Sequence, residues 1–404
     1  MSEKGVVIVG AGQAGCSAAA KLRALGHDGP VTLVGEEAYL PYQRPPLSKA
    51  YLLGEMEAER LHLRAPSFYE EQNITALVGE KVTAIDREAC RIALAERELP
   101  YWQLILTTGS LPRRLPAAIG GNLEGAYTIR SITDIDGASP KFKAGRKLLV
   151  VGGGYIGLEV AAVARKLGLE VTLVEAAPRI LQRVAAKETS DYFRALHESH
   201  GVTILEGVGL ERLLGEERVT GARLANGAVL EADFAVLGIG IAPDTALAEA
   251  AGLKIDNGIW TDAFGRTSDP NIWAAGDCAS FPYGEERIRL ESVGNAIDQA
   301  EAVAANIMGR NEAYRAKPWF WSDQYDVKLQ IAGLNSGYDS LVVRQTSDHS
   351  QSFWYYSGER LLAVDAMNDP RGYMVAKRLI ELGRSPDKAQ VADPQSNLKA
   401  LLKG

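Results

Sequence analysis

VVIVGAGQAG, at residues 6–15, decides the fold of this chain. An apolar run suited to a buried strand is followed by a glycine turn, an Ala-rich helix, a second strand at residues 31–34 and then Glu36. The glycines let the backbone approach a pyrophosphate, which sits at the helix N-terminus, and the carboxylate accepts hydrogen bonds from ribose hydroxyls. This stretch predicts a dinucleotide-binding α/β fold.

A second copy of the pattern, LLVVGGGYIG, stands at residues 148–157, with its second strand at residues 171–174 and its acid at Glu175. A single glycine motif of this kind is not specific, because Gly-rich loops produce it often. Two copies, each with flanking strands and an acid at the same place, are typical of a chain that binds two dinucleotides. Such a chain usually transfers electrons between them.

Composition limits the classes of protein that remain. The 404 residues are 46% apolar and 24% charged, as in ordinary globular proteins of two or three domains. No apolar run approaches the ~18 residues of a membrane helix, and the first strand starts too early for a signal peptide. Three isolated cysteines fit a reducing cytoplasm, and a net charge of −7 disfavours nucleic acid as a partner.

His197 and His200 are spaced as half of a metal site, but no cysteine or acid completes the pattern. A solvated helix face is the expected explanation of this pair. We therefore expect a soluble, cytoplasmic protein without a structural metal, which binds neither nucleic acid nor membrane.

The rest of the chain repeats one plan and then changes character. Each predicted βαβ unit is followed by short alternating strands and an apolar return strand, at residues 104–107 and 235–238. A further apolar strand at residues 271–275 and a helix from about Val293 are assigned back to the first unit. From Trp319, aromatic and β-branched strands precede one helix and a polar tail of ~20 residues, which is expected to be loosely held.

The expected fold class is therefore α/β, with two Rossmann-like dinucleotide-binding domains and a C-terminal α+β domain. The first domain takes residues 1–112 and 242–318, the inserted second domain residues 113–241, and the C-terminal domain residues 319–404. Pro112 and Pro243 mark the two crossings between the first domain and the second.

Five short motifs carry a resemblance to a known family. They are PYQRPPLSK at residues 41–49, TTG at 107–109, GIAP at 240–243, GD at 276–277 and WFWSDQ at 319–324. In this order the chain resembles the two-dinucleotide flavoproteins typified by glutathione reductase, and within them the ferredoxin reductases of bacterial oxygenase systems. The resemblance covers essentially the whole chain.

By this resemblance the first site holds FAD and the second holds the nicotinamide dinucleotide, NADH. Asp277 is matched to the ribityl chain of FAD, Val293 to the pyrimidine edge of the flavin and Trp321 to the face of its ring. The full set implied for FAD is Gly10, Gly12, Ala14, Gly15, Glu36, Arg44, Lys49, Val82, Arg130, Asp277, Val293 and Trp321. The set implied for the nicotinamide dinucleotide is Gly152, Gly154, Gly157 and Glu175.

For two acidic residues near the second glycine turn, the sequence leads to more specific expectations. A 2′-phosphate beside Glu175 would meet a repulsion of roughly 4 kcal/mol per unit charge at 4 Å and an effective dielectric near 20, which favours NADH over NADPH. Arg179, four residues after Glu175, is a cation that would offset this repulsion, and it leaves the preference for NADH over NADPH open. Glu159 suits the first turn of any helix, but in the family the matching acid pairs with a lysine near the flavin. The resemblance therefore implies a catalytic Lys49–Glu159 ion pair at the site of hydride transfer.

The kind of electron acceptor is inferred from the absence of cysteines in the segment expected beside the flavin. Disulfide reductases of this family need a redox-active cysteine pair beside the flavin, and residues 35–53 contain no cysteine. Tyr42 stands where a peroxide-reducing relative would carry one. The resemblance thus implies hydride transfer from NADH to FAD, followed by one-electron transfers to a [2Fe–2S] ferredoxin that feeds an oxygenase.

Ferredoxins are usually acidic, so a transient complex with one requires a basic docking face on this acidic chain. The candidates are Arg310, Arg315, Lys317, Lys377, Arg378, Arg384 and Lys388. Two alternative functions stay open: an NADH oxidase or quinone reductase, and an NADH-sensing flavoprotein resembling apoptosis-inducing factor.

Overall fold

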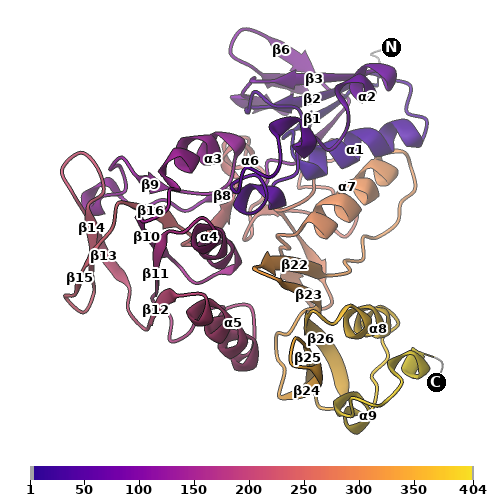
Figure 1. Ribbon diagram of the computed structural model, residues 1–404. Coiled ribbons are helices and arrows are strands. Elements are labelled where there is room, and N and C mark those ends of the chain that lie inside the picture. Colours follow the sequence, from indigo (N-terminus) through magenta and orange to yellow (C-terminus); the bar gives the residue numbers. More distant parts are fainter. Residues whose placement is uncertain (1–3, 403–404) are drawn as a thin grey trace. The chain divides into compact units, whose positions relative to one another are not determined.

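The computed structural model describes residues 4–402, which form two compact units (Figure 1). The first unit takes the described residues up to Gln43, then Ala58–Leu111 and Ile241–Pro318. The second unit takes Arg44–Glu57, Pro112–Gly240 and the described residues from Trp319 onward. The two units do not coincide with the three domains expected from the sequence, because Arg44–Glu57 and the residues from Trp319 onward belong to the second unit. The three-domain division stays a prediction.

A five-stranded parallel sheet organises the first unit, in the order β19-β7-β1-β2-β3. All four residues of the first strand are buried, as a strand covered on both faces requires. Helices α1 and α7 pack against each other, as Figure 1 shows, and share one apolar core with the sheet. The elements are β1 (Val6–Val9), α1 (Gln13–Ala24), β2 (Val31–Gly35), β3 (Ile74–Val78), β7 (Gln103–Leu106), β19 (Ile272–Ala274) and α7 (Val293–Ile307).

Smaller elements complete this unit. Two three-stranded sheets have the orders β4-β5-β6 and β18-β20-β21, and β8 pairs with β17 where the chain leaves and re-enters the unit. These elements are α2 (Pro66–Glu71), β4 (Ala84–Asp86), β5 (Arg91–Ala93), β6 (Glu98–Pro100), β8 (Ser110–Pro112), β17 (Ile241–Pro243), α6 (Ala246–Ala250), β18 (Ile259–Trp260), β20 (Ala279–Tyr283) and β21 (Glu286–Ile288).

The second unit contains a parallel sheet of the same plan, in the order β12-β11-β10-β16-β9. Its edge strand β9 precedes the fingerprint in sequence, whereas the edge strand β19 of the first sheet follows the whole second fold. The elements are β9 (Ala126–Tyr127), α3 (Ile132–Ala138), β10 (Lys147–Val151), α4 (Tyr155–Lys166), β11 (Glu170–Glu175), α5 (Lys187–Ser199), β12 (Val202–Glu206), β13 (Leu210–Leu214), β14 (Gly221–Leu224), β15 (Val229–Glu231) and β16 (Phe234–Leu237).

From Trp319 the same unit forms an antiparallel sheet in the order β22-β23-β26-β25-β24. Helix α8 packs on its strands β23 and β26, and Trp354 and Tyr356 are fully buried in the core between them. The elements are β22 (Trp319–Gln324), β23 (Val327–Gly333), β24 (Ser340–Ser347), β25 (Ser350–Ser357), β26 (Arg360–Met367), α8 (Pro370–Glu381), α9 (Lys388–Ala392) and a 3-10 turn (Leu398–Leu402).

The expectation of a loosely held C-terminal tail is wrong for the residues that the structure describes. Val391 and Leu398 are buried in the core of the C-terminal sheet. The buried guanidinium of Arg344, on β24, donates hydrogen bonds to the carbonyl oxygens of Val391 (3.0 Å) and Pro394 (3.0 Å) and to the hydroxyl of Ser396 (3.0 Å). A polar segment is thus held by one buried cation and two apolar anchors.

In the part of the chain that the structure describes, no helix combines the length and the apolar character needed to cross a membrane.

Candidate functional site

The first glycine turn leaves open space at the N-terminus of α1. Gly10 has a φ of +116°, and a Cβ there would stand 2.2 Å from the carbonyl oxygen of Thr107. A Cβ on Gly15 would meet the carbonyl oxygen of Gly10 at 2.0 Å, whereas a Cβ on Gly12 would meet nothing within 4 Å. The backbone is packed tightly on the inner side and open on the outer side, which fits the pyrophosphate of FAD.

The other residues of the first unit that the sequence assigns to FAD lie at the ends of its strands and helices. Glu36 directly follows β2, and its Oε1 lies 2.9 Å from Nζ of Lys81, with both side chains about two-thirds exposed. Asp277 comes soon after β19 and accepts a hydrogen bond from Ser110 Oγ (3.0 Å). Val293 is the first residue of α7.

Ala14 and Val82 in the same unit are buried. Ala14 lies in the core on α1, and a Cβ on Gly276 would stand 3.0 Å from its methyl group. Val82 precedes β4 and belongs to the apolar cluster on the other side of the sheet. Side-chain packing in the core therefore accounts for both positions.

The second glycine turn repeats the geometry of the first. Gly152 has a φ of +104°, and a Cβ there would stand 2.3 Å from the carbonyl oxygen of Gly238. A Cβ on Gly157 would meet the carbonyl oxygen of Gly152 at 2.2 Å, and a Cβ on Gly154 would meet nothing within 4 Å. The N-terminus of α4 is therefore as open to a pyrophosphate as that of α1, and it fits NAD(H) in the same way.

Glu175, the last residue of β11, is fixed against this turn by the backbone. Its Oε2 accepts the N–H of Gly153 at 2.7 Å and its Oε1 accepts the N–H of Ala177 at 2.7 Å. The guanidinium of Arg179 points elsewhere, since it donates to the carbonyl oxygens of Ala185 (2.9 Å) and Ala186 (3.2 Å). The negative charge beside the second dinucleotide fold is thus held in place, and the nearest arginine in sequence is bound to other groups.

Lys49 and Glu159 form an ion pair within the second unit, with Lys49 Nζ 2.6 Å from Glu159 Oε2. Lys49 ends a short 3-10 turn at Pro45–Ser48, and Glu159 lies on α4 just after the second glycine turn. The carboxylate is only 4% exposed. It also accepts hydrogen bonds from Ser48 Oγ (2.5 Å) and Ser322 Oγ (2.7 Å). A buried carboxylate is stable when donors surround it in this way.

Three further predicted residues also lie in the second unit. Arg44 Nη1 donates to the backbone carbonyl of Arg130 at 2.6 Å, so these two residues are in direct contact. Trp321, on β22, stacks on Trp319 with ring centroids 5.5 Å apart. Trp321 is half-buried.

His197 is the clearest correction to the sequence analysis. It is completely buried on α5 rather than on a solvated helix face, and its Nε2 lies 2.8 Å from Gln324 Oε1 on β22. Burial lowers the pKa of His197 to about 4, so the ring is neutral at physiological pH. His200 is exposed and stacks on Tyr325 with centroids 3.7 Å apart.

Sequence reasoning missed the hydroxyl and amide partners of this cluster: Ser48, Ser322 and Gln324. A signal was present, because Ser322 and Gln324 are two residues apart on a strand and so share one face. Polar residues on the inward face of a strand in the motif WFWSDQ require buried partners. Glu159 and His197 are those partners.

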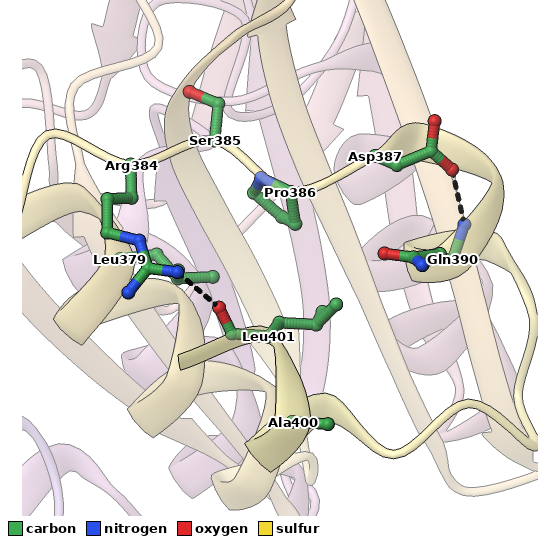
Figure 2. Close-up of a pocket in the computed structure, with 8 residues that line it drawn as sticks. All are labelled: Leu379, Arg384, Ser385, Pro386, Asp387, Gln390, Ala400 and Leu401. Carbon is green, nitrogen blue, oxygen red and sulfur yellow. Dashed lines mark hydrogen bonds between the residues drawn. The ribbon is translucent and has the colours of Figure 1, made fainter. Parts of the chain in front are cut away.

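A pocket of about 370 Å³ lies among the C-terminal elements, and none of the predicted site residues lines it (Figure 2). Arg384 donates there to the carbonyl oxygen of Leu401 (3.1 Å), and Asp387 accepts the N–H of Gln390 (3.0 Å) at the start of α9. Arg384 thus joins the segment after α8 to the last turn and Asp387 caps α9, so the pocket is explained by the packing of the tail.

Several basic residues considered for docking have acidic neighbours in their own unit. The amine of Lys388 lies 3.5 Å from Glu359, and the guanidinium of Arg310 lies 3.1 Å from Glu312. Lys377 pairs with Glu381 on α8, to which Arg378 also approaches at 3.6 Å. Arg315 and Lys317 are both exposed.

Comparison with known proteins identifies the family of the chain. Residues 4–300 match the family model of the pyridine nucleotide-disulphide oxidoreductases, and residues 319–402 match that of the reductase C-terminal domain. Rhodocoxin reductase of Rhodococcus erythropolis is 43% identical over 402 residues, which cover 98% of this chain and 94% of that protein.

Two further relatives agree. The anthranilate 1,2-dioxygenase system ferredoxin–NAD(+) reductase component of Burkholderia cepacia is 39% identical, with all of both chains covered. The crystal structure of a covalent putidaredoxin reductase–putidaredoxin complex matches with a TM-score of 0.96 at 41% identity, covering 99% of this chain and 98% of that chain.

These relationships confirm the predicted fold class, the class of enzyme and the two cofactors, FAD and NAD(H). The individual cofactor contacts stay predictions. The chain belongs to the pyridine nucleotide-disulphide oxidoreductase family and, within that family, to the ferredoxin reductases.

Proposed function

We propose that this enzyme takes hydride from NADH onto FAD and passes the electrons one at a time to a [2Fe–2S] ferredoxin that feeds an oxygenase. The observation that carries the proposal is the pair of matching glycine turns, each open at a helix N-terminus, in a chain of this family. When bound, FAD supplies the conversion of a two-electron hydride into single electrons. The residues described above bind, orient and shield the two dinucleotides.

In the first unit, Gly10, Gly12 and Gly15 let the backbone N–H groups of α1 reach the FAD pyrophosphate. The exposed carboxylate of Glu36 accepts hydrogen bonds from the adenosine ribose, and Asp277 does so from the ribityl chain. Val293 presents the first N–H groups of α7 to the flavin, and a helix N-terminus there favours negative charge on the ring. Ala14, Arg44, Val82, Arg130 and Trp321 complete the proposed contacts.

In the second unit, Gly152, Gly154 and Gly157 receive the pyrophosphate of NADH, and Glu175 receives its adenosine ribose. The Lys49–Glu159 pair lies next to this turn, because Glu159 is on the helix that the turn begins. We assign the pair to the site of hydride transfer, where Glu159 holds the amine of Lys49 in a fixed position. A fixed positive charge stabilises charge that develops during the reaction without reorganising first.

The choice of an external one-electron acceptor is supported by the thiol groups. Cys16 and Cys278 are buried, and burial raises the pKa of both thiols, so they are poor redox nucleophiles. No cysteine occurs between residues 35 and 53. A dithiol relay therefore has no candidate residues in that segment, which favours direct transfer from the flavin to an external acceptor.

Two relatives are named for such acceptors or for systems that contain them. One is rhodocoxin reductase, and another is the ferredoxin reductase component of the anthranilate dioxygenase system. We further propose that this chain works in the cytoplasm, where NADH is available and where free cysteines persist.

The test of this function is NADH-driven reduction of cytochrome c, with and without a [2Fe–2S] ferredoxin from the same organism. We expect turnover that depends strongly on the ferredoxin and saturates with it. Turnover that ignores the ferredoxin but consumes oxygen or a quinone would instead show an oxidase or quinone reductase. A stable complex formed on NADH addition, with negligible turnover, would show an NADH-sensing flavoprotein.

A further inference from the structure

The buried carboxylate of Glu159 lies at the end of a continuous chain of hydrogen bonds that crosses the second unit. Ser322 Oγ donates to Glu159 Oε1 (2.7 Å), and Gln324 Nε2 donates to Ser322 Oγ (3.1 Å). Gln324 Oε1 lies 2.8 Å from His197 Nε2, and His197 Nδ1 lies 3.2 Å from the hydroxyl of Tyr325. Glu159, Ser322, Gln324 and His197 are all less than 5% exposed.

The chemistry of the groups fixes which group donates and which accepts in each of these hydrogen bonds. An ionised carboxylate only accepts, so the Ser322 hydroxyl gives its proton to Glu159 and must itself accept from Gln324. The opposite amide orientation would place two acceptors, from Gln324 and Glu159, against the single proton of Ser322. The amide oxygen of Gln324 therefore faces His197, whose Nε2 carries the proton. Every donor in the chain points toward Glu159.

We propose that Ser322 is a positioning residue for Glu159, and that Gln324 and His197 act behind it by fixing the direction of its hydroxyl proton. This inference rests on the proposed role of the Lys49–Glu159 pair in hydride transfer. Oε2 of Glu159 is shared by Lys49 and Ser48, whereas among residues 4–402 the hydrogen bond to Oε1 comes from the hydroxyl of Ser322 on β22. Ser322 thus sets the rotation of the carboxylate, and with it the place of the Lys49 amine.

Ser352, on β25, provides a matched control elsewhere in the protein. Its hydroxyl is also completely buried, donates to a carboxylate (Asp369 Oδ2, 2.9 Å) and accepts an N–H from two residues further on (Trp354 Nε1, 3.0 Å). Ser322→Ala and Ser352→Ala therefore remove the same kind of group from the same sheet. Loss of stability should be similar in both variants, while only one of them touches Glu159.

The experiment is anaerobic stopped-flow reduction of the FAD-loaded enzyme by NADH. For Ser322→Ala we expect the limiting rate constant to fall about tenfold, as loss of a hydrogen bond to a charged group allows, with less than about a twofold change in the apparent Kd for NADH. Ser352→Ala should retain both values. Equal rates for the two variants would overturn the inference.

A double-mutant cycle separates a positioning role from a general one. If Ser322 acts through Glu159, adding Ser322→Ala to Glu159→Gln should slow reduction by less than about twofold further. The same tenfold loss in that background would contradict the inference. Glu159→Gln alone tests the proposed function: an unchanged rate would overturn the role of the pair and the inference with it, whereas a slow Glu159→Gln with a normal Ser322→Ala would overturn the inference alone.

A spectroscopic measurement tests the direction of the chain without kinetics. The ¹⁵N spectrum of the histidine ring should show His197 neutral with its proton on Nε2 between about pH 6 and 8. In Gln324→Met, which removes the amide and keeps the length of the side chain, that tautomer should lose its preference. A proton on Nδ1 in the unmodified protein would contradict the proposed orientation.

Discussion

Glu36 and Glu175 occupy the same place in the two dinucleotide folds but are held differently. Glu36 is paired with the exposed amine of Lys81, so its carboxylate can exchange that partner for a ribose. Glu175 accepts two backbone N–H groups and is thereby fixed in position. A fixed charge discriminates between ligands more sharply than a mobile one, because it does not move away from a repulsive group.

This difference leads to a prediction about coenzyme preference. Glu175→Gln removes the charge and keeps an acceptor for the loop N–H groups. We expect the ratio of kcat/KM for NADH to that for NADPH to fall by about tenfold or more, because a 2′-phosphate no longer meets a fixed carboxylate. Steady-state kinetics with both coenzymes measure it. Glu36→Gln is the control, and a ratio that is the same in Glu175→Gln as in the unmodified enzyme would contradict the assignment.

A second prediction at this scale concerns the Lys49 amine. Lys49→Met keeps the length of the side chain and removes the charge, so anaerobic flavin reduction by NADH should slow by about tenfold or more, with FAD still bound. The absorbance of the flavin band reports the amount of bound FAD, and its decrease with time reports the rate of flavin reduction. Lys166→Met is the matched control, since Lys166 pairs with Glu55 at the surface of the same unit (2.8 Å). Reduction at the original rate would remove Lys49 from the proposed mechanism.

Sequence reasoning reached the pairing of Lys49 with Glu159 because Lys49 lies in a motif of the family and Glu159 matches the acid that pairs with such a lysine in its members. It did not reach Ser48, Ser322 or the burial of His197. Hydroxyl groups on distant segments carry no local pattern, and a histidine on a polar helix is buried only when another strand covers it. That covering strand, β22, supplies Gln324 as the partner, and no periodicity within α5 indicates it.

At the scale of elements, helix α5 meets the C-terminal sheet through a buried acid. Asp365, on β26, accepts a hydrogen bond from Thr189 Oγ1 (2.7 Å) and another from the hydroxyl of Tyr355. Burial raises the pKa of Asp365 to about 6 from its usual value near 3.8, and Tyr155 and Tyr355 are the titratable groups that face it. His197, at the other end of α5, has its pKa lowered from 6.5 to about 4 by burial.

These two shifts act on stability in opposite directions. The native state binds the Asp365 proton more tightly than the unfolded chain does, so this contribution is complete below about pH 3.8 and is lost as pH rises through about 6. The native state binds the His197 proton less tightly, so that contribution is complete above about pH 6.5 and is lost as pH falls toward 4. Between about pH 4 and 6 the two largely cancel.

Single variants should therefore reveal a pH dependence that the unmodified protein hides. Asp365→Asn should lose stability as pH falls from 6.5 to 4, and His197→Gln should gain stability over the same range, each by about 3 kcal/mol for a shift of about two pKa units. Urea unfolding of the holoenzyme at several pH values measures both slopes. The double variant should restore a shallow slope, and two single variants with the slope of the unmodified protein would refute the argument.

Most elements could be predicted from the sequence, because parallel strands buried on both faces are continuous apolar runs. The apolar return strands expected at residues 104–107 and 235–238, for example, are β7 (Gln103–Leu106) and β16 (Phe234–Leu237), each shifted by one residue and buried throughout. Irregular strand pairing and the fold of the tail could not be predicted from the sequence. The pairing of β13 with β14 contains a register shift between Leu210 and Arg212 that no local pattern indicates, and the tail is ordered by Arg344, whose role depends on carbonyl groups far along the chain.

At the scale of the whole molecule, a net charge of −7 opposes the docking of a ferredoxin, which is usually an acidic protein. Such a partner requires a local basic face, and the exposed Arg315 and Lys317 are the candidates with the greatest freedom to serve it. The rate of ferredoxin reduction should therefore fall as ionic strength rises, because screening weakens the attraction of exposed charges. A rate that is insensitive to salt would contradict electrostatic docking.

Charge reversal localises the same effect. Lys317→Glu should lower kcat/KM for the ferredoxin by about fivefold at low salt, with NADH-driven reduction of the flavin unchanged. Lys143→Glu makes the same change of charge at another exposed lysine and should have a much smaller effect. Equal losses in the two variants would assign the effect to net charge rather than to a docking face.

The position of β19 also has a consequence for how the protein is made. The first parallel sheet receives its last strand, and α1 its partner α7, from residues that follow the entire second dinucleotide fold in sequence. The second sheet is built from residues 126–237, without any such interruption. On the ribosome, the later-synthesised fold is therefore complete first, while the N-terminal one waits with an unpaired sheet edge. A chain truncated before residue 272 should therefore emerge with its first sheet unfinished, and we expect the flavin that we propose for this fold to be incorporated late in biosynthesis.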